Sequence, residues 1–75
     1  MPRLPVVSGP ELVRALTRAG FVLDRQSGSH AVLFDPITSN FVSVPMHGGR
    51  DLPVGTVRSI LRDARLTVAR FRELL

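Results

Sequence analysis

Hydrophobic positions near the start of the chain recur with the period of a helix. The apolar residues that would share one face are Leu12, Ala15, Leu16 and Ala19. Ser8 and Glu11 occupy the two positions of a capping box, and Pro10 falls in the first turn, where a missing N–H costs nothing. Gly20 is suited to the left-handed conformation that follows a last helical turn. The pattern predicts a helix over about residues 9–19.

The next part of the chain alternates between short apolar runs and turn-forming residues. Strands are expected at residues 21–26, 29–35 and 41–44. Ser27-Gly28 supplies the first tight turn. The second turn spans Asp35 to Asn40, and we expect Asn40 to tolerate a left-handed backbone there. Pro45 ends the third strand. These short connections predict a three-stranded antiparallel meander.

Helical spacing returns after a loop that contains Gly48-Gly49. The helix expected over Val54–Ala64 has an apolar stripe of Val57, Ile60, Leu61 and Ala64. Thr67 is placed to cap a last short helix from Val68 to about Leu74. Residues 1–7 are expected to be extended, because Pro2 and Pro5 disfavour helix around them.

The predicted order of elements is α-β-β-β-α, followed by the short helix. We expect one α+β domain over residues 1–75, with two main helices on one face of a three-stranded antiparallel sheet and the other face partly open. The double-stranded-RNA-binding domain is one fold with this order. A chain of 75 residues buries roughly 60% of its unfolded surface, so we expect a thin margin of stability.

Composition excludes several kinds of site. The chain has no cysteine, so disulfides and thiolate metal sites are excluded, and its two histidines and six acidic residues are a poor ligand set for structural zinc. We therefore expect neither a metal nor a small-molecule cofactor. The longest apolar run, Ala31 to Phe34, is far short of the ~20 residues that cross a bilayer. We expect a cytoplasmic protein with no export signal and no membrane partner.

The net charge is +4, and all ten basic residues are arginine. Arginine pairs bidentately with phosphate, which favours a nucleic-acid partner, although a preference for arginine codons would also explain the missing lysine. Arg58, Arg62 and Arg65 share one stripe of the second helix, and Arg14 and Arg18 lie on the outer face of the first. These arginines are candidates for phosphate contacts, for contacts with an acidic protein, or for an ordinary solvated surface.

The only two histidines stand beside turn-forming residues at the edges of apolar runs. His30 follows Gly28-Ser29 at the start of a strand, so it would be rigidly held and still reachable. Gly28 would let a phosphate approach the backbone, and Ser29 has a hydroxyl to donate to it. An imidazole here suits general acid or base chemistry on RNA; otherwise it only ends a strand. His47 is a candidate second acid, a phosphate contact or a brace for its loop.

Four segments, in this order and spacing, resemble the HicA-type toxins of HicAB toxin–antitoxin systems. The segments are Ser8–Phe21, Gly28–His30, Val44–His47 and Leu52–Leu61, and together they span nearly the whole chain. The family often has a lysine before the Gly-Ser-His triplet, where this chain has Gln26-Ser27. Arg25 is the candidate to replace that phosphate contact.

The resemblance implies a double-stranded-RNA-binding-like fold and metal-independent cleavage of mRNA in the cytoplasm. It also implies neutralisation by a cognate HicB-type antitoxin. In the family the histidine of the Gly-Ser-His turn is catalytic, and the matching residue is His30. Two alternatives remain: a non-catalytic RNA-binding module of the same fold, and a subunit whose basic surface serves an acidic protein. Because phenylalanine is the only aromatic residue, we expect any preference for RNA sequence to be modest.

Overall fold

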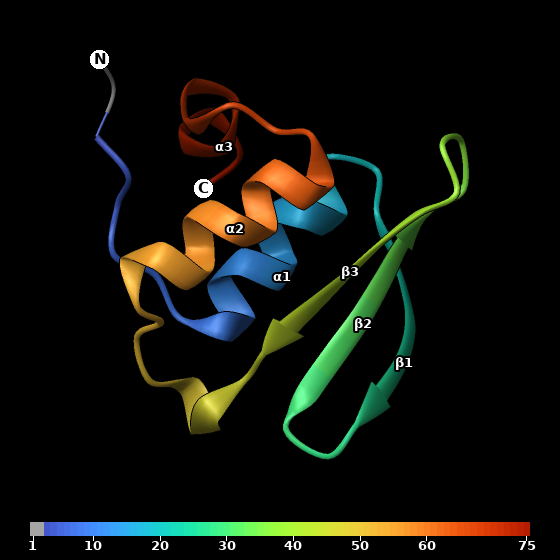
Figure 1. The fold of residues 1–75 in the computed structure, drawn as a ribbon, viewed down its shortest axis with the longest axis horizontal. Coiled ribbons are helices and arrows are strands. Elements are labelled where there is room, and N and C mark those ends of the chain that lie inside the picture. Colours follow the sequence, from blue (N-terminus) through green and yellow to red (C-terminus); the bar gives the residue numbers. More distant parts are fainter. Residues whose placement is uncertain (1–2) are drawn as a thin grey trace.

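The helices lie where the sequence predicts them. The computed structural model describes residues 3–75, so the extended backbone expected at Pro2 lies outside the described residues. The elements in chain order are α1 (Gly9–Arg18), β1 (Val22–Ser27), β2 (His30–Asp35), β3 (Asn40–Pro45), the short turn η1 (His47–Gly49), α2 (Val54–Ala64) and α3 (Val68–Leu74) (Figure 1). The predicted α-β-β-β-α order with a short terminal helix is confirmed.

The capping box before α1 is present in full. The backbone N–H of Glu11 donates to the Ser8 hydroxyl over 3.3 Å, and the N–H of Ser8 donates to the Glu11 carboxylate over 2.9 Å. The latter bond is the main cause that lowers the pKa of Glu11 from its ordinary value, and the Ser8 hydroxyl adds to it. At the other end of α1, Gly20 has φ +109°, as expected of the residue that ends a helix.

The sheet is antiparallel with the order β1-β2-β3, and its two faces differ sharply. In β2 and β3 the buried side chains alternate with less buried ones. The buried ones are Ala31, Leu33, Val42 and Val44. They form one core with side chains of all three helices, among them Leu16, Leu61 and Phe71. The prediction of two main helices on one face is therefore confirmed, and the opposite face carries exposed residues such as His30, Phe41 and Ser43.

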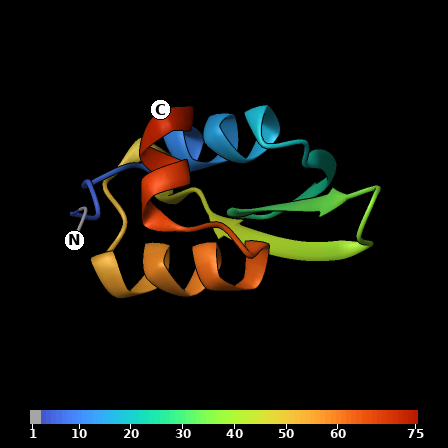
Figure 2. The same ribbon diagram turned by 90° about the horizontal axis from the view of Figure 1, so that it is seen from above.

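Strand β1 takes little part in this core. All six of its residues are exposed, including Val22 and Leu23, and the register between β1 and β2 shifts between Leu23 and Arg25. Phe21, which we assigned to the first strand, precedes β1 and is buried. The end of the sheet with the β2–β3 connection projects beyond the helices (Figure 2). Apolar residues in a predicted strand thus do not always mark a core position.

Two turn assignments from the sequence are wrong by one residue. Ser27 pairs with His30 as the last residue of β1, so the tight turn is Gly28-Ser29 and β2 begins at His30. In the second turn the left-handed residue is Ser39, with φ +62°, and not Asn40. Asn40 instead begins β3, where its side-chain amide donates to the backbone carbonyl of Asp63 in α2.

The residues before α1 fasten the loop that follows β3. The N–H of Leu52 donates to the carbonyl of Val7 over 2.8 Å, and Ser8 forms an isolated bridge with Asp51. Gly9 is so close to the end of β3 that a Cβ there would collide with the carbonyl oxygen of Pro45. The backbone from residues 7 to 9 therefore lies between the end of β3 and the start of the segment leading into α2.

We expect Gly9→Ala to lower the free energy of unfolding by about 1–3 kcal/mol, as inserting a methyl group into a packed site does. The added Cβ would also lie 2.9 Å from the Cα of Met46, and neither neighbour is a flexible side chain. Urea denaturation measures the change. Gly55→Ala is the matched control, because a Cβ there meets nothing within 4 Å and alanine is the better helix former. An equal effect of the two substitutions would show that the close contact at Gly9 does not limit the fold.

Candidate functional site

The Gly-Ser-His segment forms the β1–β2 turn and the first residue of β2. Gly28 has φ +58°, and a Cβ at this position would meet nothing within 4 Å, so its backbone faces open space. Ser27 and His30 are opposite each other in the ladder on either side of the turn. The imidazole of His30 is exposed. His30 itself is the first residue of β2, the strand that is hydrogen-bonded to a neighbouring strand on both sides. It is therefore both rigidly mounted and accessible.

Two contacts of Ser29 lie next to the His30 ring. The backbone N–H of Met46 donates to the carbonyl of Ser29 over 2.6 Å, and this bond joins the hairpin turn to the end of β3. The Ser29 hydroxyl oxygen lies 3.5 Å from Nδ1 of His30, at the outer limit of a hydrogen bond. A hydroxyl can accept from Nδ1–H or donate to a bare Nδ1, so Ser29 is placed to influence which ring nitrogen carries the proton.

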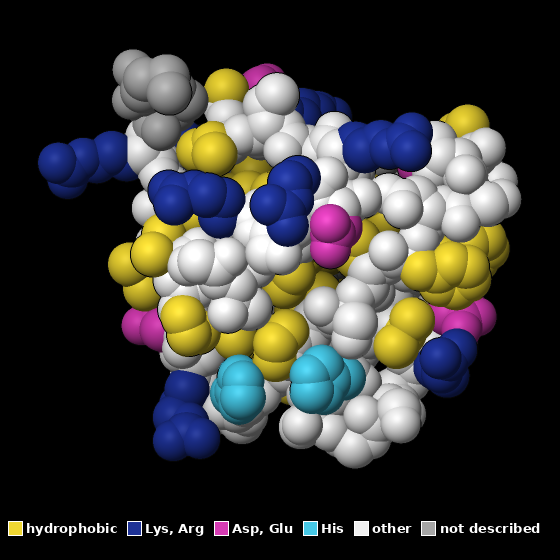
Figure 3. Space-filling view, viewed as in Figure 1, with side chains coloured by type: hydrophobic (Ala, Val, Ile, Leu, Met, Phe, Trp, Pro, Cys, Tyr) yellow, Lys and Arg dark blue, Asp and Glu magenta, His cyan; other side chains and the backbone are white. Residues whose placement is uncertain are grey.

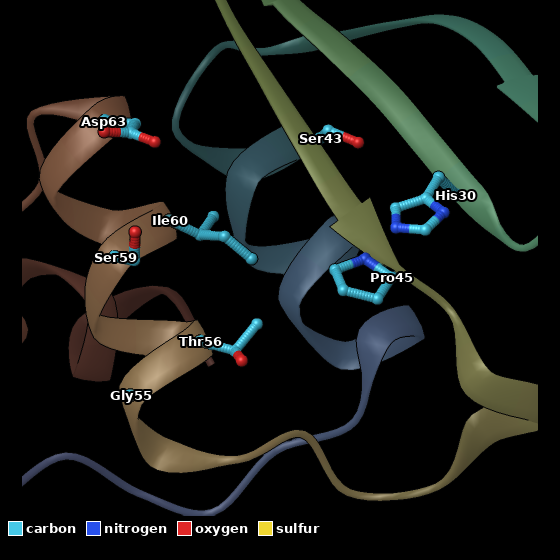
Figure 4. A pocket seen from close by; sticks show the side chains of 8 residues that line it. All are labelled: His30, Ser43, Pro45, Gly55, Thr56, Ser59, Ile60 and Asp63. Carbon is cyan, nitrogen blue, oxygen red and sulfur yellow. The ribbon is translucent and has the colours of Figure 1, made fainter.

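An open cleft of about 450 Å³ lies between the sheet and α2 (Figure 4). The sheet contributes His30, Ser43 and Pro45 to its lining. Helix α2 contributes Gly55, Thr56, Ser59, Ile60 and Asp63. Positions 56, 59, 60 and 63 share one side of a helix, and Ile60 belongs both to this side and to the stripe that packs into the core. The cleft therefore forms because α2 lies alongside β3 and contacts this strand.

The cleft lining mixes polar and apolar surface in similar amounts. Its side-chain hydroxyls belong to Ser43, Thr56 and Ser59, and its apolar side chains to Pro45 and Ile60. Its two ionisable groups lie at opposite ends of β3. His30 pairs with Pro45 at the end of that strand, and the Asp63 backbone is bonded to Asn40 at its start. Figure 4 shows the Asp63 carboxylate extending from α2 toward the strand.

Of the predicted arginines, Arg62 is the one that contacts the cleft. Its Nη2 donates to the Ser59 hydroxyl over 3.3 Å, so the guanidinium lies at the rim. Arg58 and Arg65 are also exposed, and Figure 3 shows basic side chains over α2 beside an acidic one. Arg18 has a structural use that helical spacing alone does not reveal. Its Nη1 donates to the carbonyl of Leu74 over 2.7 Å and ties α3 to α1.

Arg25 lies on the same face of the sheet as His30. It pairs with Val32 in the ladder, and Ser27 pairs with His30, which makes Arg25 a diagonal neighbour of His30 at about 7–8 Å. Its Nη1 contacts the Asp24 carboxylate at 2.9 Å, and both side chains are exposed. Such a pair contributes little to stability, so a phosphate could compete for the guanidinium.

His47 is exposed and shares a face of the molecule with His30, as the two cyan side chains in Figure 3 show. It is not part of the cleft lining. Its φ is +45°, and Gly48 and Gly49 follow with +60° and +84°. Three successive left-handed residues explain the glycine pair, because glycine adopts this conformation without strain. His47 bears the strain that the glycines avoid.

The sequence reading missed most of the cleft. Ser43, Thr56, Ser59 and Asp63 were not among the candidate residues, and of those candidates His30 alone lines the cleft. The one signal in the sequence was the polar side of α2, where hydroxyl and carboxylate residues recur at helical spacing beside the core stripe. That side became informative only once the strand next to it was known.

Comparison with known proteins identifies a family. A family model described as "HicA toxin of bacterial toxin-antitoxin" matches residues 9–66, which include every element from α1 to α2. No curated protein matches the chain. Within residues 3–75, no helix is long and apolar enough to cross a membrane. In the same range, no group of three or more His, Asp and Glu side chains is arranged to hold a metal ion.

We expect His47→Gly to be more stable than His47→Ala by about 1 kcal/mol, since a left-handed backbone costs a non-glycine residue about 1–2 kcal/mol. Urea denaturation of the two variants measures the difference. Arg50 provides the control pair, because its φ is −74° and glycine has no such advantage there. If glycine and alanine at position 47 gave equal stability, the left-handed conformation of this residue would be disproved.

Proposed function

Because the chain belongs to the HicA toxin family, we propose that it is an endoribonuclease that cleaves mRNA, with His30 as general acid or base. The toxins of this family act in toxin–antitoxin pairs, so the family also implies an antitoxin partner. The observation that supports the ribonuclease proposal most directly is the position of His30. An exposed imidazole stands on a rigid strand at one end of an open cleft. This is the geometry that proton transfer to a bound nucleic acid requires.

The chemistry needs only the RNA and a positioned imidazole. A neutral His30 takes the proton of a ribose 2′-OH, and the oxygen attacks the adjacent phosphorus. The P–O5′ bond breaks, and the 5′ oxygen leaves with a proton supplied by an acid, either water or an imidazolium. The products are a 2′,3′-cyclic phosphate and a 5′-hydroxyl. General acid–base help of this kind contributes typically about 10²–10⁴-fold to the rate.

Ser29 would act through the ring of His30. If Nδ1–H donates to the Ser29 hydroxyl, Nε2 keeps its lone pair and serves as the base. The 3.5 Å separation is long for this bond, and catalytic hydrogen bonds often shorten when substrate binds. The bond between Met46 and Ser29 holds the serine backbone in place for this contact.

Phosphate groups on either side of the cleaved bond would be held by backbone and arginine. Gly28 exposes its backbone at the turn next to His30, where a phosphate can approach closely. Arg25 lies on the same sheet face, and Arg62 stands at the rim of the cleft. Arg58, one turn before Arg62, extends the positive charge along α2. Contacts of this kind fix the position of an RNA backbone without reading its sequence.

The same surface suits inhibition by a HicB-type antitoxin. A protein that covers His30 and pairs with the arginines would block the cleft and compete with mRNA for binding to these side chains. The net charge of +4 favours an acidic partner surface. We place both the mRNA target and the antitoxin in the cytoplasm, where mRNA is translated.

We expect His30→Ala to lower the cleavage rate of a purified RNA by about 10²–10⁴-fold and to abolish growth arrest in a host without the antitoxin. The side chain is exposed, so the variant should keep its fold, which circular dichroism checks. His47→Gly is the matched control: it removes the other imidazole and preserves the left-handed backbone. It should retain most of the cleavage.

Other outcomes would assign the residues differently. If the parent protein bound RNA without cutting it, and His30→Ala bound equally well, the chain would be a non-catalytic RNA-binding module. If both histidine variants lost cleavage equally, His47 would supply the second proton transfer. If His30→Ala cut RNA at the parent rate, His30 would have no catalytic part.

A further inference from the structure

We infer that the cleft between β3 and α2 binds an unpaired nucleoside of the RNA near the cleaved phosphate, and that Asp63 selects bases carrying an exocyclic amino group over uracil. This rests on the proposed ribonuclease function and adds a substrate-recognition site to it.

The size of the cleft fits a single nucleoside. Its volume of about 450 Å³ falls toward the lower end of the range of roughly 300–1,000 Å³ found for small-molecule sites. Helix α2 bounds it on one side and β3 on the other. An unpaired base from a single-stranded segment is the part of an RNA that such a space accepts.

The lining suits a nucleoside in its chemistry as well. Pro45 and the small exposed part of the otherwise buried Ile60 provide apolar contacts for the face of a base. Hydroxyls from both walls, such as those of Ser43 and Thr56, can donate or accept hydrogen bonds to the ribose and the base edge. His30 lines the opposite end of the same cleft, so an RNA strand whose base reaches Asp63 would continue along β3 toward the imidazole.

Asp63 is the group that would discriminate between bases. The Asp63 carboxylate lies close to Arg58 and Arg62 in sequence. Its negative charge weakens the binding of phosphate groups at this helix, so it does not help to hold the RNA backbone. Within residues 3–75 the two ion pairs join Arg25 to Asp24 and Arg70 to Glu73, and neither engages Asp63. Its backbone carbonyl is held by the Asn40 side chain, which fixes this end of α2 against the start of β3.

An ionised carboxylate accepts hydrogen bonds and donates none. Cytosine, adenine and guanine offer it an amino group on the Watson–Crick edge, and acidic side chains do accept from the amino group of cytosine. Uracil offers a single N–H between two carbonyl oxygens, which a carboxylate repels. Asp63 should therefore disfavour uracil, and this predicts more base selectivity than the scarcity of aromatic residues alone would indicate.

The test is a titration of the isotope-labelled protein with the 3′-monophosphates of cytidine, adenosine, guanosine and uridine, followed by amide chemical shifts. We expect shifts concentrated at Gly55, Thr56, Ser59 and Ser43, and about tenfold weaker binding of the uridine nucleotide. Inorganic phosphate alone should not shift the amides of Thr56 and Ser59. Asp63→Asn, which can both donate and accept, should bring the four affinities together, and Asp63→Ala should do the same.

Asp51→Asn is the control, since this exposed carboxylate lies outside the cleft. It should leave the preference unchanged. Equal affinity for all four nucleotides in the parent protein, shifts located away from the cleft, or a preference that survives both Asp63 variants would overturn the inference. The readout is binding and not cleavage. Nucleotides that occupy the cleft of a protein unable to cut RNA would refute the ribonuclease proposal alone, and cleavage without selective binding would refute the nucleoside site alone.

Discussion

The contact between Gly9 and the end of β3 is the constraint on which the site depends. No side chain fits between the first residue of α1 and the carbonyl of Pro45, so helix and strand end meet backbone to backbone. Directly after this contact, the N–H of Met46 bonds to the carbonyl of Ser29. The position of the β1–β2 turn, and with it His30, is therefore determined by how α1 enters the fold.

One side of helix α2 packs into the core, and the adjacent side lines the cleft. Val57, Leu61 and Ala64 are buried against the sheet and the other helices. The next side of the same helix, with Thr56, Ser59 and Asp63, faces β3 across the cleft. A small domain has few elements to spare, and this arrangement lets the packing that stabilises the fold also fix the width of the cleft. Substitutions in the core stripe of α2 should therefore affect substrate binding as well as stability.

Local signals made the helices predictable. The capping box at Ser8 and Glu11, the glycine after α1 and the cap at Thr67 are short-range interactions that the chain makes wherever it folds. The start of β3 was less predictable, because Asn40 is drawn into the strand by a bond to Asp63, 23 residues away. The exposure of β1 also depends on tertiary structure, since its Val22 and Leu23 are apolar and yet lie exposed.

The candidate site was predictable only in part, for the same reason. His30 was recognisable because its turn, its strand and its family motif are contiguous in the sequence. Ser43 and Ser59 come together only when β3 and α2 lie side by side, and each alone is an ordinary serine. Arg18 was a candidate for a phosphate contact, for a contact with an acidic protein or for a solvated surface, and its bond to the carbonyl of Leu74, 56 residues away, was not among these expectations. Long-range partners of this kind leave no local pattern.

If His30 activates the ribose hydroxyl of the RNA itself, cleavage requires that hydroxyl at the cleaved bond. An RNA that the protein cuts at one bond would be resynthesised with a single 2′-deoxy residue on the 5′ side of that bond. We expect cleavage there to be abolished, whereas a 2′-deoxy residue on the 3′ side should leave it intact, because only the former removes the attacking oxygen. Continued cleavage at the modified bond would mean that water attacks the phosphorus, and the role proposed for His30 would be wrong.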